Sequence, residues 1–320
     1  MPDSSCALQV ISLAKRFSGG AGISHVSLSV PAGSITGFIG ANGSGKSTTL
    51  RCVLGMLRPD SGDVRLFGAR ADKAVRRRVG FMPEERGLFP HERARDAIAF
   101  HGRLKGMNRY DAFVAADRLL ARVGLGGRQH ARVGSLSKGN AQRVQVLCAL
   151  VHKPDLLLLD EPLSGLDPIA QSDMLSLLAE FRGTGGAILF STHSMPAAEN
   201  LCDRVVMLAN GRTVFEGTLA GASALAPHGA IVVTADARGL AATTKMLGGY
   251  VQSLGSSLGE AARLRVMLPP TVTHPTLLQA LAERAVSIFS FEPIKPDLEA
   301  AFWQLADTES TDRSKPHRAA

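Results

Sequence analysis

The chain has 320 residues, of which 45 % are hydrophobic and 20 % are charged, and it carries a formal net charge of +8. This composition excludes a disordered or collagen-like chain and is typical of a globular protein with one large domain, or with a large and a small one. The N-terminal sequence MPDSSCALQV lacks the positive charge and apolar core of a secretory signal, and the apolar run Leu156–Leu159 is too short to span a membrane, so we expect a cytoplasmic protein.

Four apolar, strand-like runs indicate the core of the fold. They occupy residues 35–39, 156–159, 187–190 and 205–208, and segments with helical spacing separate them. This alternation predicts an α/β fold with a mainly parallel core sheet. Residues from about 85 to 153 are predicted to form a helical subdomain, and the pair Asn210-Gly211 favours a tight hairpin into a last short strand at 214–217.

The first motif that carries chemistry is Gly40–Ser47, with the sequence GANGSGKS. It matches GxxxxGK[ST] and lies between the apolar run ITGFI and a predicted helix, as a phosphate-binding loop requires. Glycine permits the positive φ angles and the close backbone approach with which such a loop wraps phosphate. We expect Lys46 to reach the β- and γ-phosphates and Ser47 to bind Mg²⁺. The other expected phosphate-binding residues are Asn42, Gly43, Ser44, Gly45 and Thr48. An ordinary glycine-rich turn is the alternative.

Residues 65–109 carry nearly all the excess positive charge, with 12 Lys/Arg against 5 Asp/Glu. Three explanations are open for this segment: a solvated face, a contact with a membrane subunit or lipid head groups, or a nucleic-acid surface. The four cysteines, at positions 6, 52, 148 and 202, form no CxxC pair, so we expect buried free thiols rather than a metal site.

Two adjacent carboxylates, Asp160 and Glu161, end the run Leu156–Leu159. A buried strand delivers such groups to the carboxyl edge of a sheet, where ligands of open α/β folds collect. We expect Asp160 to hold Mg²⁺ through water and Glu161 to polarise a water for in-line attack on a γ-phosphate. Alone, this pattern is more typical of a core strand that ends in solvated acids. After a phosphate-binding loop, it indicates nucleotide hydrolysis.

Further motifs follow in an order that resembles the ATP-binding cassette (ABC) ATPases. Leu136–Asn140, LSKGN, resembles the signature LSGGQ of that family, with Lys and Asn at its third and fifth places. Ser164–Asp167, SGLD, is similar to the family's D-loop, and His193 stands where the family has its switch histidine. Phe17 lies where the family stacks an aromatic ring on adenine. The resemblance covers residues from about 8 to 220.

The signature segment also has a physical interpretation of its own. Ser137 is a favourable helix N-cap before Gly139 and a predicted helix at 141–152, so its N–H groups and the helix dipole would attract an anion. The resemblance implies that Ser137 and Gly139 serve the nucleotide of a second subunit in a head-to-tail dimer. The alternative is a plain helix cap.

One departure and a closer similarity to a subgroup refine the resemblance. Glu84 follows Phe81-Met82-Pro83 where the family has the glutamine of its Q-loop, and a carboxylate there is still able to ligate a metal. The segments PEERGLFP and LSKGN resemble a subgroup of exporters with separately encoded membrane subunits. The closing sequence KPDLEAAF is similar to the C-terminal extension of that subgroup.

The sequence pattern changes after the small-residue stretch GTLAGASALAPHG, which predicts a domain boundary at about residue 221. We expect an ATP-binding domain at 1–220, a small α+β module at 221–306 and a disordered tail at 307–320. In the module, strands are predicted at 231–234, 264–268 and 286–291 and helices at 239–247 and 276–284. A last helix is predicted after the N-cap Asp297.

The sequence therefore predicts an ATP-binding and ATP-hydrolysing subunit of an ABC export system. Its expected partners are an integral membrane transporter subunit and a second copy of the chain, with no direct contact to nucleic acid, and its expected place is peripheral, on the cytoplasmic face of the membrane. The alternative is a soluble ABC ATPase that acts on ribosomes or nucleic acid, although one cassette and no long insertion weigh against it. A P-loop small-molecule kinase would not explain LSKGN, SGLD or His193.

Overall fold

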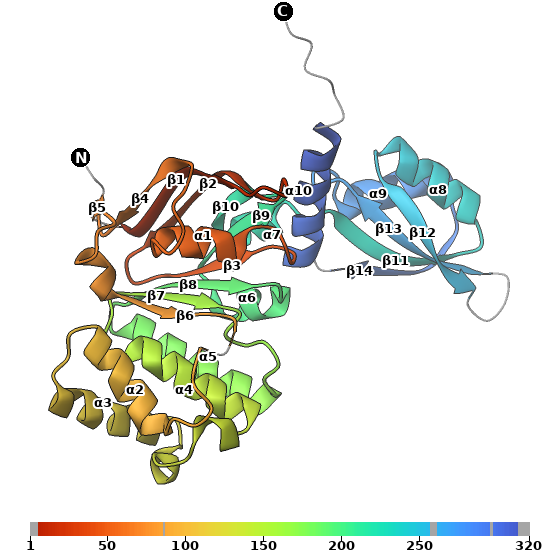
Figure 1. Ribbon diagram of the computed structural model, residues 1–320. Coiled ribbons are helices and arrows are strands. Elements are labelled where there is room, and N and C mark those ends of the chain that lie inside the picture. The colour runs from red at the N-terminus through yellow and green to blue at the C-terminus, as the bar shows by residue number, and fades with distance from the viewer. Residues whose placement is uncertain (1–5, 86, 257–260, 295–296, 313–320) are drawn as a thin grey trace, which may run out of the picture. The chain divides into compact units, whose positions relative to one another are not determined.

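The computed structural model describes residues 6–85, 87–256, 261–294 and 297–312. It divides into two compact units, residues 1–217 and 218–320, and the boundary expected at about residue 221 lies close to this division. The predicted α/β class with a small α+β module is confirmed (Figure 1). Within the described residues, no helix is both long and apolar enough to span a membrane.

A six-stranded sheet in the order β10-β9-β3-β8-β7-β6 forms the centre of the first unit. Its strands are β3 (Ile35–Ile39), β6 (Val79–Met82), β7 (Leu156–Asp160), β8 (Ala187–Thr192), β9 (Arg204–Ala209) and β10 (Arg212–Thr218). The pairs β3/β8, β3/β9, β7/β8 and β6/β7 are parallel. Strands β3, β7 and β8 are buried along their whole length, which explains why their sequences are mainly apolar and do not alternate with polar residues.

A second, antiparallel sheet in the order β2-β1-β4-β5 was not predicted. Its strands are β1 (Cys6–Arg16), β2 (Gly22–Pro31), β4 (Ser61–Leu66) and β5 (Ala69–Arg70). The pairing of β1 with β2 changes register between Val10 and Leu13, where Ser12 has a positive φ of 46°. Such a bulge moves the buried side chains out of strict alternation, so the period-2 pattern is interrupted in the sequence.

Helix α1 (Lys46–Val53) lies between the two sheets, as Figure 1 shows. Its Leu50 and Val53 share a buried core with Leu8 and Val10 of the antiparallel sheet and with Leu158 of the parallel sheet. The other helices of this unit are α2 (Ala94–Leu104), α3 (Arg109–Arg122), α4 (Lys138–Leu150), α5 (Pro168–Gly183) and α6 (Met195–Leu201), with short 3₁₀ turns at Val75–Arg78, Gly126–Arg128 and Val133–Ser135. Helices α2, α3 and α4 gather on the side of β6 (Figure 1).

The second unit is built on an antiparallel sheet in the order β12-β13-β11-β14. Its strands are β11 (His228–Thr234), β12 (Tyr250–Ser256), β13 (Ala262–Leu268) and β14 (Ile288–Ile294). Helices α8 (Ala237–Met246) and α9 (His274–Glu283) cover one face, where Leu240 and Leu277 pack against Val232, Leu264 and Val266. The alternating residues of β13, among them Arg265 and Met267, therefore lie on the opposite face.

The two helices at the ends of this unit are α7 (Leu219–Ser223) and α10 (Leu298–Asp312). The predicted N-cap of α10 is confirmed, because Asp297 Oδ1 accepts a 2.7 Å hydrogen bond from the backbone N–H of Ala300. The expectation of a disordered tail from residue 307 needs correction, since α10 continues to Asp312. Each further helical residue adds one hydrogen bond to an existing helix, so an established helix extends readily. Residues 313–320 lie outside the described part.

Candidate functional site

Three neighbouring parallel strands bring the predicted motifs to one edge of the six-stranded sheet. Strand β3 precedes the loop that begins at Gly40, β7 ends at Asp160, and β8 precedes His193. The register aligns their ends, because Ile39 is opposite Thr192 and Asp160 is opposite Ser191. Carboxyl ends of adjacent parallel strands form the usual ligand-binding edge of such sheets.

The glycines of the loop are required by its geometry. Gly43 and Gly45 have φ angles of 80° and 108°, which L side chains rarely adopt. A Cβ on Gly45 would lie 2.3 Å from Cγ2 of Ile23, and one on Gly40 would lie 2.5 Å from Oγ of Ser44. Helix α1 then starts at Lys46 without a side-chain cap, so its first N–H groups face the loop and offer an anion site.

Lys46 is buried, with its ammonium group inside the loop. Its Nζ donates hydrogen bonds to the carbonyl oxygens of Gly40 (2.6 Å) and Ala41 (3.3 Å). Burial lowers the pKa of Lys46, and the nearby carboxylates of Glu161, Asp160 and Glu84 oppose this shift. A phosphate would therefore stabilise a cation that the loop holds with carbonyl oxygens alone.

The carboxylates at the end of β7 are buried too. Asp160 accepts a short hydrogen bond from Oγ of Ser191 on β8. Glu161 is 6 % exposed and has a left-handed backbone with φ of 51°, a strained conformation of the kind that is concentrated at functional sites. Its Oε1 lies 2.9 Å from Nδ1 of His193. Burial raises the pKa of Glu161, while the contact with His193 and the charge of Lys46 act in the opposite direction.

Lys46, Asp160 and Glu161 line one cavity of about 350 Å³ in the first unit, and His193, which contacts Glu161, is not in this lining. Its lining consists of Phe17, Ala21, Gly22, Asn42, Gly43, Ser44, Gly45, Lys46, Ser47, Thr48, Glu84, Asp160 and Glu161. Phe17, 43 % exposed, offers a ring for stacking against a base. The buried Oγ of Ser44 has no hydrogen-bond partner among the described residues, and such an orphaned group marks a place for a polar ligand. The structure thus brings together all the predicted nucleotide-binding residues except Ser137 and Gly139, which are not in this lining.

The signature segment stands apart, at the N-terminus of α4. The predicted cap is confirmed, because the Oγ of Ser137 accepts a 3.3 Å hydrogen bond from the backbone N–H of Asn140. Helix α4 begins at Lys138, earlier than predicted. The Lys138 side chain lies over Gly165 of the SGLD segment, since a Cβ on Gly165 would be 1.9 Å from Nζ of Lys138. Lysine at the third signature position therefore contacts the D-loop-like turn.

Two glutamines on α4 were not singled out from the sequence. Nε2 of Gln142 donates to the carbonyl oxygens of Pro162 (2.6 Å) and Glu161 (3.4 Å). Nε2 of the buried Gln145 donates to those of Pro83 (2.8 Å) and Glu85 (3.1 Å). The helix that begins at the signature thus holds the loops on both sides of the nucleotide cavity. Glutamine is a common helix former, so no local signal separated these two from solvent-facing residues.

A groove of about 380 Å³ lies between α2, α4 and the end of α1. Its lining is Leu54, Met56, Arg76, Phe81, Pro83, Gly87, Leu88, His101, Leu104, Lys105, Gln145, Cys148, Ala149 and His152. Met56 and Leu104 are 66 % and 64 % exposed, which is high for large apolar side chains. Burial and the nearby Lys105 lower the pKa of His152 to about 4, so this imidazole is neutral at pH 7. The groove is apolar and its charged side chains are basic.

No group of three or more His, Cys, Asp or Glu side chains is placed to hold a metal ion in the part of the chain that the structure describes. A divalent ion in the nucleotide cavity would therefore need phosphate oxygens beside the hydroxyl of Ser47 and the carboxylates of Asp160 and Glu84. Hydroxyl and carboxylate oxygens are the hard donors that Mg²⁺ prefers, and Mg²⁺ commonly takes few protein ligands when it binds with a nucleotide.

Comparison with known proteins agrees with this geometry. A family model described as "ABC transporter" matches residues 23–164. The uncharacterized ABC transporter ATP-binding protein YhaQ of Bacillus subtilis is 36 % identical over 212 residues, which cover 66 % of this chain and 71 % of that protein. The Nod factor export ATP-binding protein I of Burkholderia lata is 39 % identical over 221 residues, covering 68 % and 70 %. A solved ATP-binding subunit of an ABC transporter superposes with a TM-score of 0.62 at 31 % identity, over 68 % of this chain and 91 % of that one.

Proposed function

Because the chain belongs to the ABC transporter ATP-binding proteins, a family that hydrolyses ATP, we propose that it is the ATPase subunit of an export system and drives a separate membrane subunit. The observation that carries the proposal is the convergence of Lys46, Asp160 and Glu161 on one cavity, with His193 2.9 Å from Glu161. Its relatives include a protein named for Nod factor export, which supports the outward direction.

In the proposed mechanism, the loop from Asn42 to Thr48 wraps the phosphates of ATP and Phe17 stacks on the base. Lys46 exchanges its bonds to Gly40 and Ala41 for bonds to the β- and γ-phosphates. Because the ammonium group is buried, its attraction for phosphate is less screened than in water. The first N–H groups of α1 add a positive dipole end to the same site.

We propose that Ser47, Asp160 and Glu84 hold Mg²⁺ together with phosphate oxygens. When bound, this ion supplies positive charge against the β- and γ-phosphate oxygens. Ser191 keeps the Asp160 carboxylate oriented through its hydrogen bond.

Glu161 is the proposed general base. Its buried carboxylate accepts a proton from the attacking water, and burial makes it more basic than an exposed glutamate. His193 approaches this carboxylate from the end of β8 and holds its orientation. The left-handed backbone turns Glu161 out of the strand and towards the cavity that it lines.

The signature helix completes the site in a dimer. Ser137 and Gly139 lie outside the cavity of their own chain, so we propose that they contact the γ-phosphate of ATP bound to a second copy. Ser137 caps the N–H of Asn140, and the remaining N–H groups of the first turn of α4, with the helix dipole, give an anion site there. ATP binding would then close the dimer, and loss of the γ-phosphate would open it.

The apolar groove is the proposed contact with the membrane subunit. It adjoins Glu84 through Pro83 and Gly87, so a helix seated in it lies beside the nucleotide cavity. Arg76, His101 and Lys105 border it, which favours an apolar segment that carries an acidic side chain. This contact would hold the chain at the cytoplasmic face of the membrane.

Fractionation of cells that produce the tagged chain tests the proposal. We expect the chain in the membrane fraction, and Met56→Glu, which places a charge in the groove, should release it while ATP binding stays intact. The matched control is Tyr110→Glu on α3, which alters a side chain that is 77 % exposed and not in the groove lining. Recovery of the parental chain with ribosomes or nucleic acid would refute the exporter proposal and support the alternative.

A further inference from the structure

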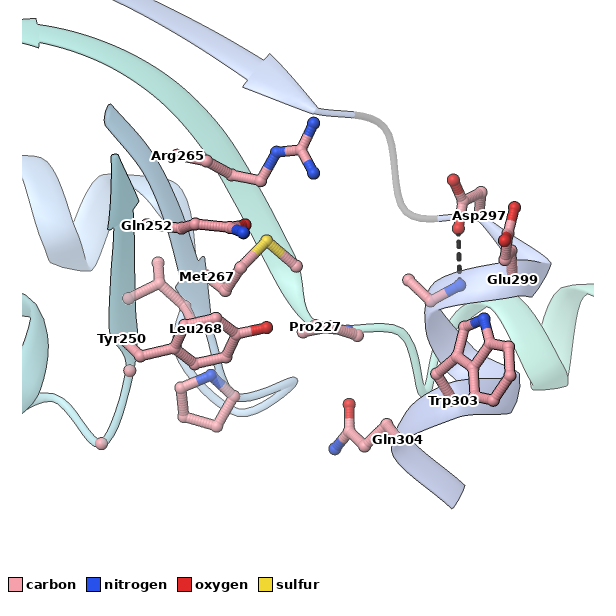
Figure 2. Close-up of a pocket in the computed structure, with 14 residues that line it drawn as sticks. Pro227, Tyr250, Gln252, Arg265, Met267, Leu268, Asp297, Glu299, Trp303 and Gln304 are labelled. Carbon is pink, nitrogen blue, oxygen red and sulfur yellow. Dashed lines mark hydrogen bonds between the residues drawn. The ribbon is translucent and has the colours of Figure 1, made fainter. Parts of the chain in front are cut away.

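The C-terminal unit contains a cavity of its own, of about 790 Å³, between its sheet and α10 (Figure 2). This volume is in the range of small-molecule sites, about 300 to 1,000 Å³. Tyr250, Gln252, Arg265 and Met267 form the sheet side, because Tyr250 pairs with Met267 and Gln252 with Arg265 across β12 and β13. The covering helices α8 and α9 pack on the other face of this sheet, so they do not fill the space.

Two aromatic side chains face the cavity from opposite walls. Figure 2 shows Tyr250 on the sheet side and Trp303 on α10 opposite it, with Pro227 drawn between them in this view. They are 64 % and 53 % exposed, whereas the neighbouring Phe302 of α10 is 2 % exposed. Large rings left open on the two sides of a cavity provide surface for an apolar or aromatic ligand, and their π-faces attract cations.

The charges of the lining distinguish between ligand classes. Asp297 and Glu299 stand on the helix side, and Arg265 stands on the sheet side. Asp297 uses Oδ1 to cap α10, as the dashed line in Figure 2 marks, so its carboxylate is fixed in place. The two carboxylates outnumber the single guanidinium, and the two ring faces also attract cations. The lining therefore favours a positively charged ligand over a negatively charged one.

We propose that this cavity binds an aromatic organic cation, with the positive centre near Asp297 and Glu299 and the apolar part between Tyr250 and Trp303. Arg265 repels the cation and limits its affinity. The site is independent of the nucleotide cavity, since no residue lines both.

A pair of probes with the same shape and opposite charge tests the proposal on the full-length chain. Trp303 is the only tryptophan of the protein, so its emission reports on this site directly. We expect tetraphenylphosphonium to change the emission of Trp303 saturably, at least tenfold more tightly than tetraphenylborate in a sodium buffer, a difference of about 1.4 kcal/mol. Equal affinity for the two probes, or no saturable change with either, would overturn the proposal.

Asp297→Asn combined with Glu299→Gln removes both negative charges while Asn keeps the cap of α10. This variant should bind tetraphenylphosphonium about tenfold more weakly, and Arg265→Gln should bind it more tightly. The matched control is Glu283→Gln on α9, which removes one exposed carboxylate from the opposite side of the sheet and should leave the affinity unchanged. An affinity within twofold of the parental value in the double variant would also overturn the proposal.

Discussion

Replacement of Glu161 by Gln tests the proposed chemistry most directly. The amide has nearly the shape of the carboxylate, so the 6 % exposed side chain keeps its packing and its place beside His193. It cannot accept the proton of the attacking water. A positioned general base contributes about 10²- to 10⁴-fold to a rate, which corresponds to about 3 to 5 kcal/mol of transition-state stabilisation. We therefore expect turnover to fall by that factor.

ATP binding should survive in Glu161→Gln, because Lys46 and Ser47 are untouched and one negative charge near the γ-phosphate is lost. Phosphate release at saturating Mg-ATP measures turnover, nucleotide retention measures binding, and gel filtration with ATP should show a lasting dimer. Glu180→Gln is the matched control, since Glu180 pairs with Arg122 on the surface. A parental rate in Glu161→Gln would refute the assignment of the base.

The pH profile gives an independent check of the same residue. Burial raises the pKa of Glu161, so on acidification the base is protonated, and turnover is lost, at a higher pH than for an exposed glutamate. The residual rate of Glu161→Gln should lack this acid limb. His193→Ala should reduce turnover much less in the Glu161→Gln background than in the parental chain, because the 2.9 Å contact couples the two side chains. Equal losses in both backgrounds would contradict that coupling.

Three further predictions concern the loop, a helix cap and the thiols. Gly45→Ala should lower ATP affinity by about tenfold or more in a calorimetric titration, because backbone strain costs about 1–3 kcal/mol and its Cβ would collide with Ile23. Gly43→Ala has open space around its Cβ, so it should lower ATP affinity less. Asp167→Ala removes the cap that accepts a hydrogen bond from the backbone at the start of α5 and should cost about 1 kcal/mol of unfolding free energy in urea, while Asn in its place should restore most of it. Under native conditions N-ethylmaleimide should label the half-buried Cys6 and spare Cys148, whose pKa is raised by complete burial; mass spectrometry would detect early labelling of Cys148 if this is wrong.

The parallel core was predictable because its strands are buried on both faces. Residues 156–159 are a continuous apolar run and residues 35–39 are mainly apolar, so both stand out without any knowledge of the fold. In the antiparallel sheet the bulge near Ser12 interrupts the alternation of β1, although β2 does alternate between buried and less buried residues from Val26 to Val30. Strand β12 was missed in the same way, because its register with β13 shifts between Ser253 and Ser256.

The nucleotide cavity was predictable as a set of motifs, but its internal contacts were not. Local sequence indicates that Lys46 and Glu161 belong to phosphate chemistry, yet the left-handed turn at Glu161 is held by a hydrogen bond from its backbone N–H to Oγ of Ser191 on β8, a residue 30 positions away. Part of the positive charge of residues 65–109 is bonded to other groups of the same chain. Arg78 pairs with Asp155, and Lys105 donates to the carbonyl oxygens of Val79 and Arg76, so these two cations serve the fold itself.

Helix α4 has a mechanical consequence that follows from its hydrogen bonds. Its 13 residues form a rod of about 20 Å, with Ser137 at one end. Gln142 and Gln145 are three residues apart, so they lie on one side of the helix. Their side chains hydrogen-bond the loops that carry Glu161 and Glu84. A small rotation of this rod would pull both loops at once. Contact of a phosphate with its N-terminus would then move the proposed general base and the border of the apolar groove together.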